Sequence, residues 1–372
     1  MRVLSVEMRS FRTYSRAQAA LGEGLTVVHG PNGVGKSNLL EAIYFGCTGR
    51  SPRTRNDREL VNFDSKTTRV IVQLLDGEQP HKLSVGYGTE AGSPQPVKRM
   101  TSDGAPVERL LDIPNRPLIS VFLPERLELV KGPPVLRRAH LDQLVAALWP
   151  LRAQLRREYS RVLAQRNALL AGIRTGRASR STLPTWDREL AIKALALQAD
   201  RAEAVELVRE PFSTRATALG CNGEVSLQYR PRSRAETVED FVAELQERLP
   251  GDIERGYSGH GPHRDDLAIV RDRRELRVYG SQGEQRIALL ALLLAERAVL
   301  AQERGRTPLM LLDDVMSELD SDRRELLATE LSSSGQSVIA TTDLAQVPGA
   351  TSATVARLRI SRGAVLQEAI AA

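Results

Sequence analysis

The segment from Gly24 to Gly49 constrains the chain more than any other. Its centre, Gly30–Ser37, has the spacing G-x-x-x-x-G-K-S of a phosphate-binding loop. The β-branched run Thr26–Val28 before it suits a buried strand, and apolar residues at helical spacing follow over residues 39–44. Glycines let backbone N–H groups close around phosphate oxygens without a Cβ in the way. The segment therefore predicts a nucleotide site. The alternative is a glycine-rich strand-to-helix turn that matches the motif by chance.

The motif assigns a role to each part of this loop. Lys36 would bind the β- and γ-phosphates, and Ser37 would hold Mg²⁺. The first turn of the following helix would add N–H donors and a favourable dipole, and Gly46 or Gly49 would end that helix. ATP and Mg²⁺ are therefore the predicted cofactors. The predicted ATP-binding residues are Gly30, Pro31, Asn32, Gly33, Val34, Gly35, Lys36, Ser37 and Asn38.

The composition permits nucleic-acid binding without requiring it. The chain has 52 Lys and Arg against 46 Asp and Glu, a net charge of +6 and a pI near 9.5. An arginine-rich surface on an ordinary protein explains this balance equally well. Two distant cysteines, Cys47 and Cys221, have no metal-like spacing and indicate a reducing, cytoplasmic location. The longest apolar run, residues 287–295, is too short to span a bilayer, so no membrane role is expected.

The chain divides into three parts by pattern. Residues 1–130 contain several alternating segments that predict strands, the first over residues 3–11. Residues 131–250 are mainly helical, with an antiparallel hairpin whose arms would be about 40 Å long at 1.5 Å per residue and whose second helix spans residues 186–208. Residues 251–372 return to loops, strands and one strongly apolar helix.

This last part contains two further candidate elements of a nucleotide site. Ser281-Gln282-Gly283 opens the apolar helix, which makes either an anion site at a helix N-terminus or an ordinary N-cap. The buried strand 308–312 ends in Asp313 and Asp314, as the acidic strand of P-loop NTPases does. Asp313 would bind the metal through water, and Asp314 would orient the attacking water. The alternative is a pair of solvated acids at a strand end.

The order of these motifs resembles the ATP-binding-cassette heads of the SMC-like class, and within that class the RecF family. The resemblance covers nearly the whole chain. It is carried by residues 30–42, 53–54, 57–60, 122–125, 132–134, 137–138, 261–267, 281–286 and 312–320.

The resemblance implies an α/β fold, an ABC-ATPase-type P-loop head with a mixed β-sheet and an inserted α-helical arm lobe. Such heads form ATP-dependent homodimers, in which Ser281, Gln282 and Gly283 would reach the γ-phosphate held by the other subunit. Ser317 and Asp320 would couple the two sites. RecF-like proteins bind DNA at single-strand/double-strand junctions and help to load recombinase with RecR and RecO. A weak, DNA-stimulated ATPase activity, with Lys36 and Asp314 as catalytic residues, would reset the dimer.

Three positions depart from the usual pattern of cassette heads. Asp314 stands where a glutamate is usual, so slow turnover is expected. Pro124-Glu125 occupies the place of the usual metal-sensing glutamine, and Thr341-Thr342-Asp343 that of the usual histidine after the last core strand. The γ-phosphate would therefore be sensed differently.

DNA contacts have less sequence support than the nucleotide site. Aromatic residues make up only 4% of the chain and no base-reading motif occurs, so binding would be mainly to phosphates and strongly salt-dependent. The basic loop 50–58 fits a solvated surface as well as a phosphate contact. The candidates are Arg53, Arg55, Arg58, Arg137 and Arg138, together with the arm arginines Arg152, Arg156, Arg157 and Arg161.

Three other classes of P-loop protein fit these motifs less well. A transporter ATPase lacks support because the chain has no membrane span and its insertion is helical and basic. A chromosome-organising SMC-like protein would need longer coiled-coil arms. A P-loop kinase for small molecules would have no use for Ser281–Gly283, and an ATP-dependent dimer would exclude it.

Overall fold

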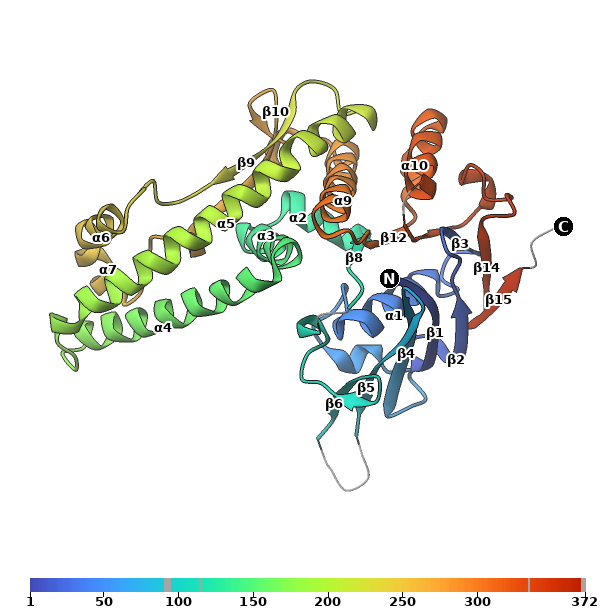
Figure 1. Ribbon diagram of the computed structural model, residues 1–372, viewed down its shortest axis with the longest axis horizontal. Helices are drawn as coiled ribbons and strands as arrows, with labels where there is room; N and C mark the ends of the chain where they lie inside the picture. The colour runs from blue at the N-terminus through green and yellow to red at the C-terminus, as the bar shows by residue number, and fades with distance from the viewer. Residues whose placement is uncertain (90–94, 114–115, 334, 369–372) are drawn as a thin grey trace. The chain divides into compact units, whose positions relative to one another are not determined.

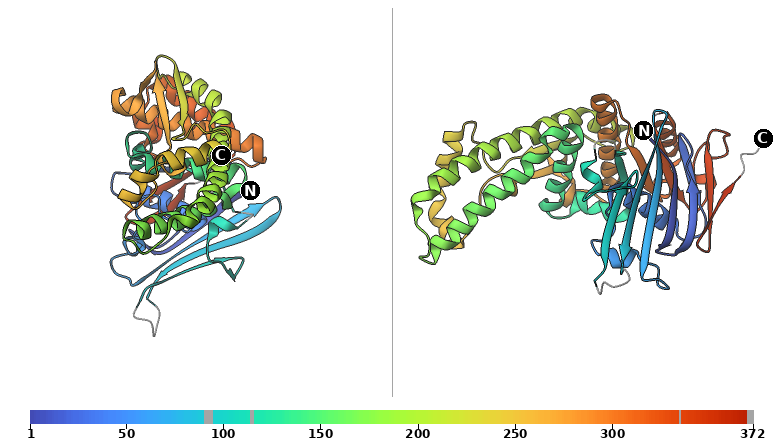
Figure 2. Two further views of the ribbon diagram at one scale, coloured as in Figure 1. Left: turned by 90° about the vertical axis from the view of Figure 1, so that its left-hand side faces the viewer. Right: turned by 60° about the horizontal axis from the view of Figure 1, so that its bottom comes forward.

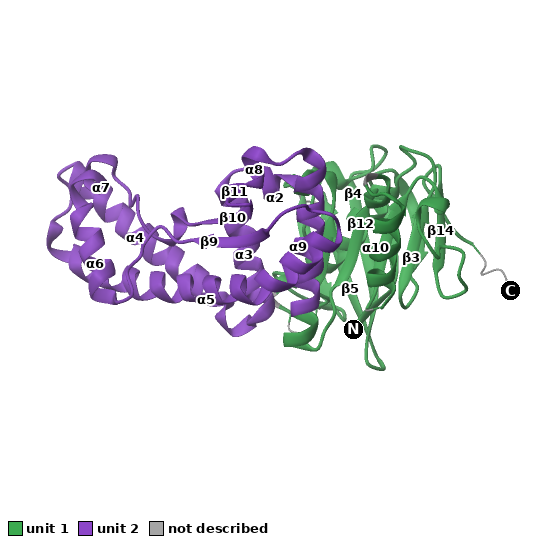
Figure 3. Ribbon diagram, turned by 90° about the horizontal axis from the view of Figure 1, so that it is seen from above, with its two compact units in different colours: residues 1–126, 300–372 green, residues 127–299 purple. Residues whose placement is uncertain are grey.

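The computed structural model describes residues 1–89, 95–113, 116–333 and 335–368 (Figure 1). Two compact units are present, residues 1–126 with 300–372 (unit 1) and residues 127–299 (unit 2), as Figure 3 shows. The boundaries expected from the sequence, 130/131 and 250/251, differ from this division. The second differs because β10 (Asp266–Arg271) pairs with β9 (Val225–Arg230), which joins residues after 250 to the helical unit.

Unit 1 contains an antiparallel sheet, hereafter the outer sheet. Its order is β2 (Tyr14–Ala20), β1 (Arg2–Phe11), β4 (Thr67–Asp76), β5 (Gln79–Gly88), β6 (Val97–Ser102) and β7 (Ala105–Pro106). No strand is expected from the sequence at β2. That strand buries only small side chains besides Tyr14, namely Ala17 and Ala19, so its apolar signal is weak.

The second sheet of unit 1, hereafter the parallel sheet, carries the phosphate loop. Its order is β15 (Ala364–Glu368), β14 (Ala356–Ser361), β3 (Leu25–His29), β13 (Ser337–Thr341), β12 (Leu309–Asp313) and β8 (Ile119–Phe122). All pairs are parallel except β14 with β15. The helix α10 (Ser321–Ser333) connects β12 to β13.

Helix α1 (Lys36–Thr48) joins both sheets into one core. Its buried residues, such as Leu39 and Ile43, share a hydrophobic core with side chains of β1, β4, β12 and β13. A Cβ at Gly46 would lie 2.4 Å from the Cγ2 atom of Val72, so this glycine allows close packing against β4 and does not end the helix. Gly49 ends it, with φ 71°.

Unit 2 is mainly helical, with a small sheet of order β11 (Arg274–Glu275), β10 and β9. Its helices are α2 (Glu128–Lys131), α3 (Pro134–Leu148), α4 (Leu155–Arg174), α5 (Leu183–Ala218), α6 (Val238–Glu247), α7 (Leu249–Arg255), α8 (Leu276–Tyr279) and α9 (Gln282–Arg304), the last of which extends into unit 1. The predicted hairpin is formed by α4 and α5, which lie side by side (Figure 2).

The hairpin has unequal arms. Helix α4 has 20 residues and α5 has 36, or about 30 and 54 Å at 1.5 Å per residue. Helix α5 continues past Pro211, where the sequence predicted an end near residue 208, because Phe212 and Ala216 beyond the proline are fully buried. The fully buried Arg166 of α4 forms ion pairs with Asp187 of α5 (2.7 Å) and with Asp252 of α7 (3.0 Å). These pairs link the two arms of the hairpin to each other and to α7.

Candidate nucleotide site

The phosphate loop runs from the end of β3 to the start of α1, as predicted. Gly30 and Gly35 have φ values of 150° and 115°, which side chains rarely allow. A Cβ at Gly30 would lie 2.6 Å from the carbonyl oxygen of Ile360, and one at Gly35 would lie 2.9 Å from the Thr13 hydroxyl. These two glycines are therefore required by the packing of the loop.

Lys36 lies inside the loop. Its ammonium donates hydrogen bonds to the carbonyl oxygens of Gly30 (2.9 Å) and Pro31 (3.0 Å). Burial lowers the pKa of Lys36, and the nearby carboxylates of Asp313 and Asp314 oppose that shift. An ammonium has three protons, so this arrangement leaves one for a phosphate oxygen even before the loop contacts change.

The carboxylate of Asp313 lies at the end of β12, close to Ser37. Burial raises the pKa of Asp313, the hydrogen bond from Ser37 lowers it, and the neighbouring Asp314 raises it again, with a net upward shift. A hydroxyl and a carboxylate are hard oxygen ligands that suit Mg²⁺, which usually completes its shell with water and phosphate oxygens. No group of three or more His, Cys, Asp or Glu side chains that could hold a metal alone occurs among the described residues.

Asp314 has an unusual backbone conformation. It lies in the left-handed region, with φ 50° and ψ 28°, and its side chain is exposed. Its N–H donates to Ala340 (3.0 Å), and its carbonyl accepts from the Ser317 hydroxyl (2.8 Å). The neighbouring β13 and the turn at 315–318 thus fix the backbone of the residue predicted to orient water.

The sequence did not predict a buried ion network beside the loop. Glu41 of α1 is fully buried and accepts hydrogen bonds from Arg12 (2.8 and 2.9 Å), Ser51 (2.6 Å) and Arg53 (3.4 Å). Arg53 also donates to Asn38 (3.2 Å). The sequence around Glu41 does not indicate these partners, because Arg12, Ser51 and Arg53 lie in loops that are separate from α1.

Arg53, which the sequence assigned to DNA, lies beside the nucleotide site, and its DNA contact stays a prediction. Besides Asn38 it contacts Glu125 (3.3 Å), and its charge lowers the pKa of Asp313. Glu125, expected at the place of a metal-sensing glutamine, is thus connected to Asn38 through the side chain of Arg53, which contacts both.

The other predicted DNA residues fall into two groups. Arg55 and Arg58 are exposed. Arg137 is only 4% exposed and binds Asp266 (2.7 and 2.9 Å), and Arg138 donates to the carbonyl oxygen of Asp265 (2.9 Å). The predicted DNA contact of Arg137 is therefore wrong. Its guanidinium is buried inside unit 2, where it binds Asp266 and stabilises that unit.

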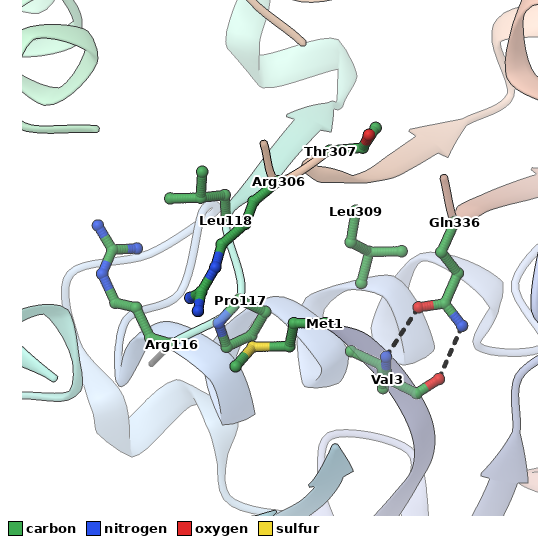
Figure 4. Close-up of a pocket in the computed structure, with 9 residues that line it drawn as sticks. All are labelled: Met1, Val3, Arg116, Pro117, Leu118, Arg306, Thr307, Leu309 and Gln336. Atoms are coloured by element: carbon green, nitrogen blue, oxygen red, sulfur yellow. Dashed lines mark hydrogen bonds between the residues drawn. The ribbon is translucent and has the colours of Figure 1, made fainter. Parts of the chain in front are cut away.

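The arm arginines also differ from one another. Arg152 forms ion pairs with Asp200 and Glu203, and Arg156 forms one with Asp142 (3.0 Å). The side chains of Arg157, Arg161 and Lys193 line an open groove of about 400 Å³ together with residues of α4. In unit 1, the cavity shown in Figure 4 measures only about 10 Å³, which is room for a water molecule at most.

The predicted signature residues, Ser281, Gln282 and Gly283, are exposed at the start of α9. The Ser281 hydroxyl accepts from the N–H of Glu284 (3.3 Å), and the Glu284 carboxylate accepts from the N–H of Ser281 (2.8 Å). This is a capping box, so the ordinary N-cap role is present within the chain. The contact with a second subunit's γ-phosphate stays a prediction, as does the coupling role of Ser317 and Asp320. Asp320 caps α10 by accepting from the N–H of Arg323 (3.0 Å).

A phosphate loop between β3 and α1, an acid-terminated parallel strand beside it and a helical unit inserted in the chain define a P-loop ATPase head of the ABC type. Residues 5–96 match a family model described as an AAA domain. A protein of Heliobacterium modesticaldum named DNA replication and repair protein RecF is 36% identical over 348 residues, which cover 92% of each chain. The chain belongs to the RecF family.

Solved structures agree with this assignment. The structure of the recombination mediator protein RecF with ATP, in the RecFOR pathway, has a TM-score of 0.85 and 28% identity, and the match covers 99% of this chain and 97% of the other. An Smc head bound to a winged-helix domain of ScpA shares the fold, with a TM-score of 0.60 and 17% identity over 100% and 98% of the two chains. No helix among the residues that the structure describes is long and apolar enough to cross a membrane.

Proposed function

We propose that this protein is an ATP-dependent DNA-binding protein of recombinational repair and replication-fork maintenance, acting in the cytoplasm. Membership of the RecF family and the likeness to a RecF–ATP complex support the proposal. The observation that carries it is the pairing of Ser37 with Asp313 beside the loop that encloses Lys36.

In the proposed mechanism, the loop surrounds the triphosphate of ATP. Lys36 would exchange its contacts with Gly30 and Pro31 for the β- and γ-phosphates, and Ser37 and Asp313 would hold Mg²⁺, which would neutralise phosphate charge. Asp314 orients the attacking water. Its side chain is one methylene shorter than the usual glutamate, so hydrolysis would be slow and would act as a switch.

ATP would bring two heads together. The N-terminus of α9, with Ser281, Gln282 and Gly283, would meet the γ-phosphate of the second subunit, and Ser317 and Asp320 would couple the two sites. The homodimer would bind single-strand/double-strand DNA junctions and help to load recombinase together with RecR and RecO. A weak ATPase activity, stimulated by DNA, would then reset it.

The test is the molar mass in solution with and without ATP. Wild type should become a dimer with ATP, Asp314→Asn should remain dimeric, and Ser281→Arg should stay monomeric. Thr237→Arg is the matched control, because Thr237 forms the capping box of α6 as Ser281 does for α9. If both arginine variants stay monomeric, loss of a cap explains the result. If ATP binds but the mass of wild type never changes, Ser281 only caps a helix and a small-molecule phosphotransferase becomes the better hypothesis.

A further inference from the structure

The outer sheet carries a row of arginines on the face that points away from α1. The register pairs Arg16 with Arg9, Arg9 with Arg69, and Arg69 with Gly86, which in turn pairs with Arg99. All four arginines are exposed. Because the strands β2, β1, β4, β5 and β6 are neighbours, this arginine row spans about 19 Å at ~4.8 Å per strand.

Cations outnumber acids among the described strand residues of this face. Among its described strand residues the only acid is Glu7, which bonds to Arg9 (2.8 Å) and lies 3.8 Å from Arg16. Lys82 of β5 adds a further cation near Glu7, and together these cations hold the pKa of Glu7 below its usual value, with the Arg9 hydrogen bond as the largest cause. No carboxylate of the described chain forms an ion pair with Arg69.

Such a row is unfavourable in an isolated protein. Like charges placed directly opposite one another on a sheet are destabilising. The row contains two such pairs, Arg9 with Arg16 and Arg9 with Arg69. A bound polyanion would remove this repulsion.

We infer that the outer sheet binds the phosphate backbone of DNA through Arg9, Arg16, Arg69 and Arg99. This inference rests on the proposed DNA binding and assigns to it a surface separate from the loop 50–58 and from the helical arm. A duplex carries one charge per ~1.7 Å of axis, so about eleven phosphates fall within the length of the row.

DNA fits the row better than an acidic protein does. Beside the row, the one exposed large apolar side chain among the described strand residues of this face is Val97 of β6, at 40%, and none is aromatic, whereas the centre of a protein interface usually buries a cluster of such groups. Gly86 has no side chain between Arg69 and Arg99, and a Cβ there would lie 3.7 Å from the Nε atom of Arg69, so the side chain of Arg69 extends over Gly86. Arginine guanidinium groups also match phosphate oxygens in pairs.

The test is DNA binding by the full-length protein with ATP, measured by fluorescence anisotropy with a labelled duplex over a range of salt. Each lost phosphate contact should reduce the magnitude of the slope of log affinity against log salt by about 0.9. At 0.1 M salt, with 1 M as the reference, this change corresponds to an affinity about eightfold lower for each lost contact. The double variant Arg16→Ala/Arg69→Ala should therefore lose about 60-fold in affinity and about 1.8 in slope. Arg69→Lys keeps the charge and should keep the slope.

Arg359→Ala is the control, an exposed arginine on β14 of the parallel sheet. ATP binding and the ATP-dependent molar mass, measured on every variant, verify that the head is folded. A double variant that is folded and binds DNA with the slope of wild type overturns the inference and favours an acidic protein partner for this face. If wild type itself binds no DNA, the proposed function fails first.

Discussion

The buried carboxylate of Glu41 offers the sharpest test of how the nucleotide site is built. Glutamine at this position keeps the shape of the side chain but removes its charge and one of its two acceptor oxygens. Glu41 accepts four hydrogen bonds, three of them from the cations Arg12 and Arg53. Each carboxylate oxygen of Glu41 accepts two of these bonds, so in Glu41→Gln two N–H or O–H donors lose their acceptor and face the amide N–H₂ group instead.

The magnitude follows from these contacts. A hydrogen bond to a charged group contributes ~1.5–3 kcal/mol, and breaking a fully buried pair costs ~3–5 kcal/mol. Arg12 and Arg53 are 21% and 30% exposed, so water replaces part of what they lose. We expect Glu41→Gln to lower the free energy of unfolding of unit 1 by about 3 kcal/mol, and to weaken ATP binding because Arg53 is no longer held beside Asn38.

Hydrogen exchange is the suitable assay, because both tryptophans, Trp149 and Trp186, lie in unit 2 and report that unit only. The slowest amides of α1 and β1 should exchange more than ~100-fold faster in Glu41→Gln, given tenfold for every 1.36 kcal/mol. Glu59→Gln, an exposed carboxylate in the same region, should change exchange little. Protection equal to wild type in Glu41→Gln would refute the idea that this network stabilises the site.

Three further predictions follow from single residues. Arg166→Ala leaves the buried carboxylate of Asp187 without its ion-pair partner and removes one of the two partners of Asp252, which keeps Arg255; it should destabilise unit 2 by ~3–5 kcal/mol in tryptophan-monitored denaturation, whereas Arg188→Ala, at an exposed ion pair, should cost under ~1 kcal/mol. Gly35→Ala introduces a Cβ 2.9 Å from the Thr13 hydroxyl at φ 115° and should weaken ATP binding at least ~10-fold by calorimetry, whereas Gly24→Ala, with open space around it, should not. The raised pKa of Asp313 means that this carboxylate is protonated at a higher pH than an ordinary aspartate, so the Mg²⁺ dependence of ATP binding should weaken as the pH falls toward that raised pKa; an Mg²⁺ affinity that does not change on acidification would contradict this.

The parts of the site that depend on local sequence could be predicted. The phosphate loop, the acid-terminated strand with Asp313 and the cap at Ser281 each arise from a few adjacent residues whose spacing dictates their geometry. The fold class of the head and its membership of the RecF family were predicted correctly for the same reason, since many such motifs occur in one order.

The parts that depend on pairing across the chain could not be predicted. Arg53 and Arg137 both looked like surface cations, and only tertiary contacts with Glu41 and Asp266 distinguish them from Arg55. The arginine row was also invisible, because its members come from four strands and only the register of the outer sheet aligns them. The alternation along a strand shows which face of the sheet a residue occupies. Which residues lie opposite it on the neighbouring strands depends on how the strands pair.

Strand β1 connects the two surfaces that the proposals require. Its outer face presents Arg9 to the arginine row, and three residues later Arg12 binds Glu41 beside the phosphate loop. Ser10 and Arg12 lie in the left-handed region, at φ 48° and 50°, so the strand bends sharply between the two contacts. If ATP raises the affinity for DNA by some factor through this strand, linkage requires that DNA raise the affinity for ATP by the same factor. Glu41→Gln leaves the groups of the arginine row unchanged, so we expect it to reduce that shared factor while the salt slope of DNA binding without ATP stays the same.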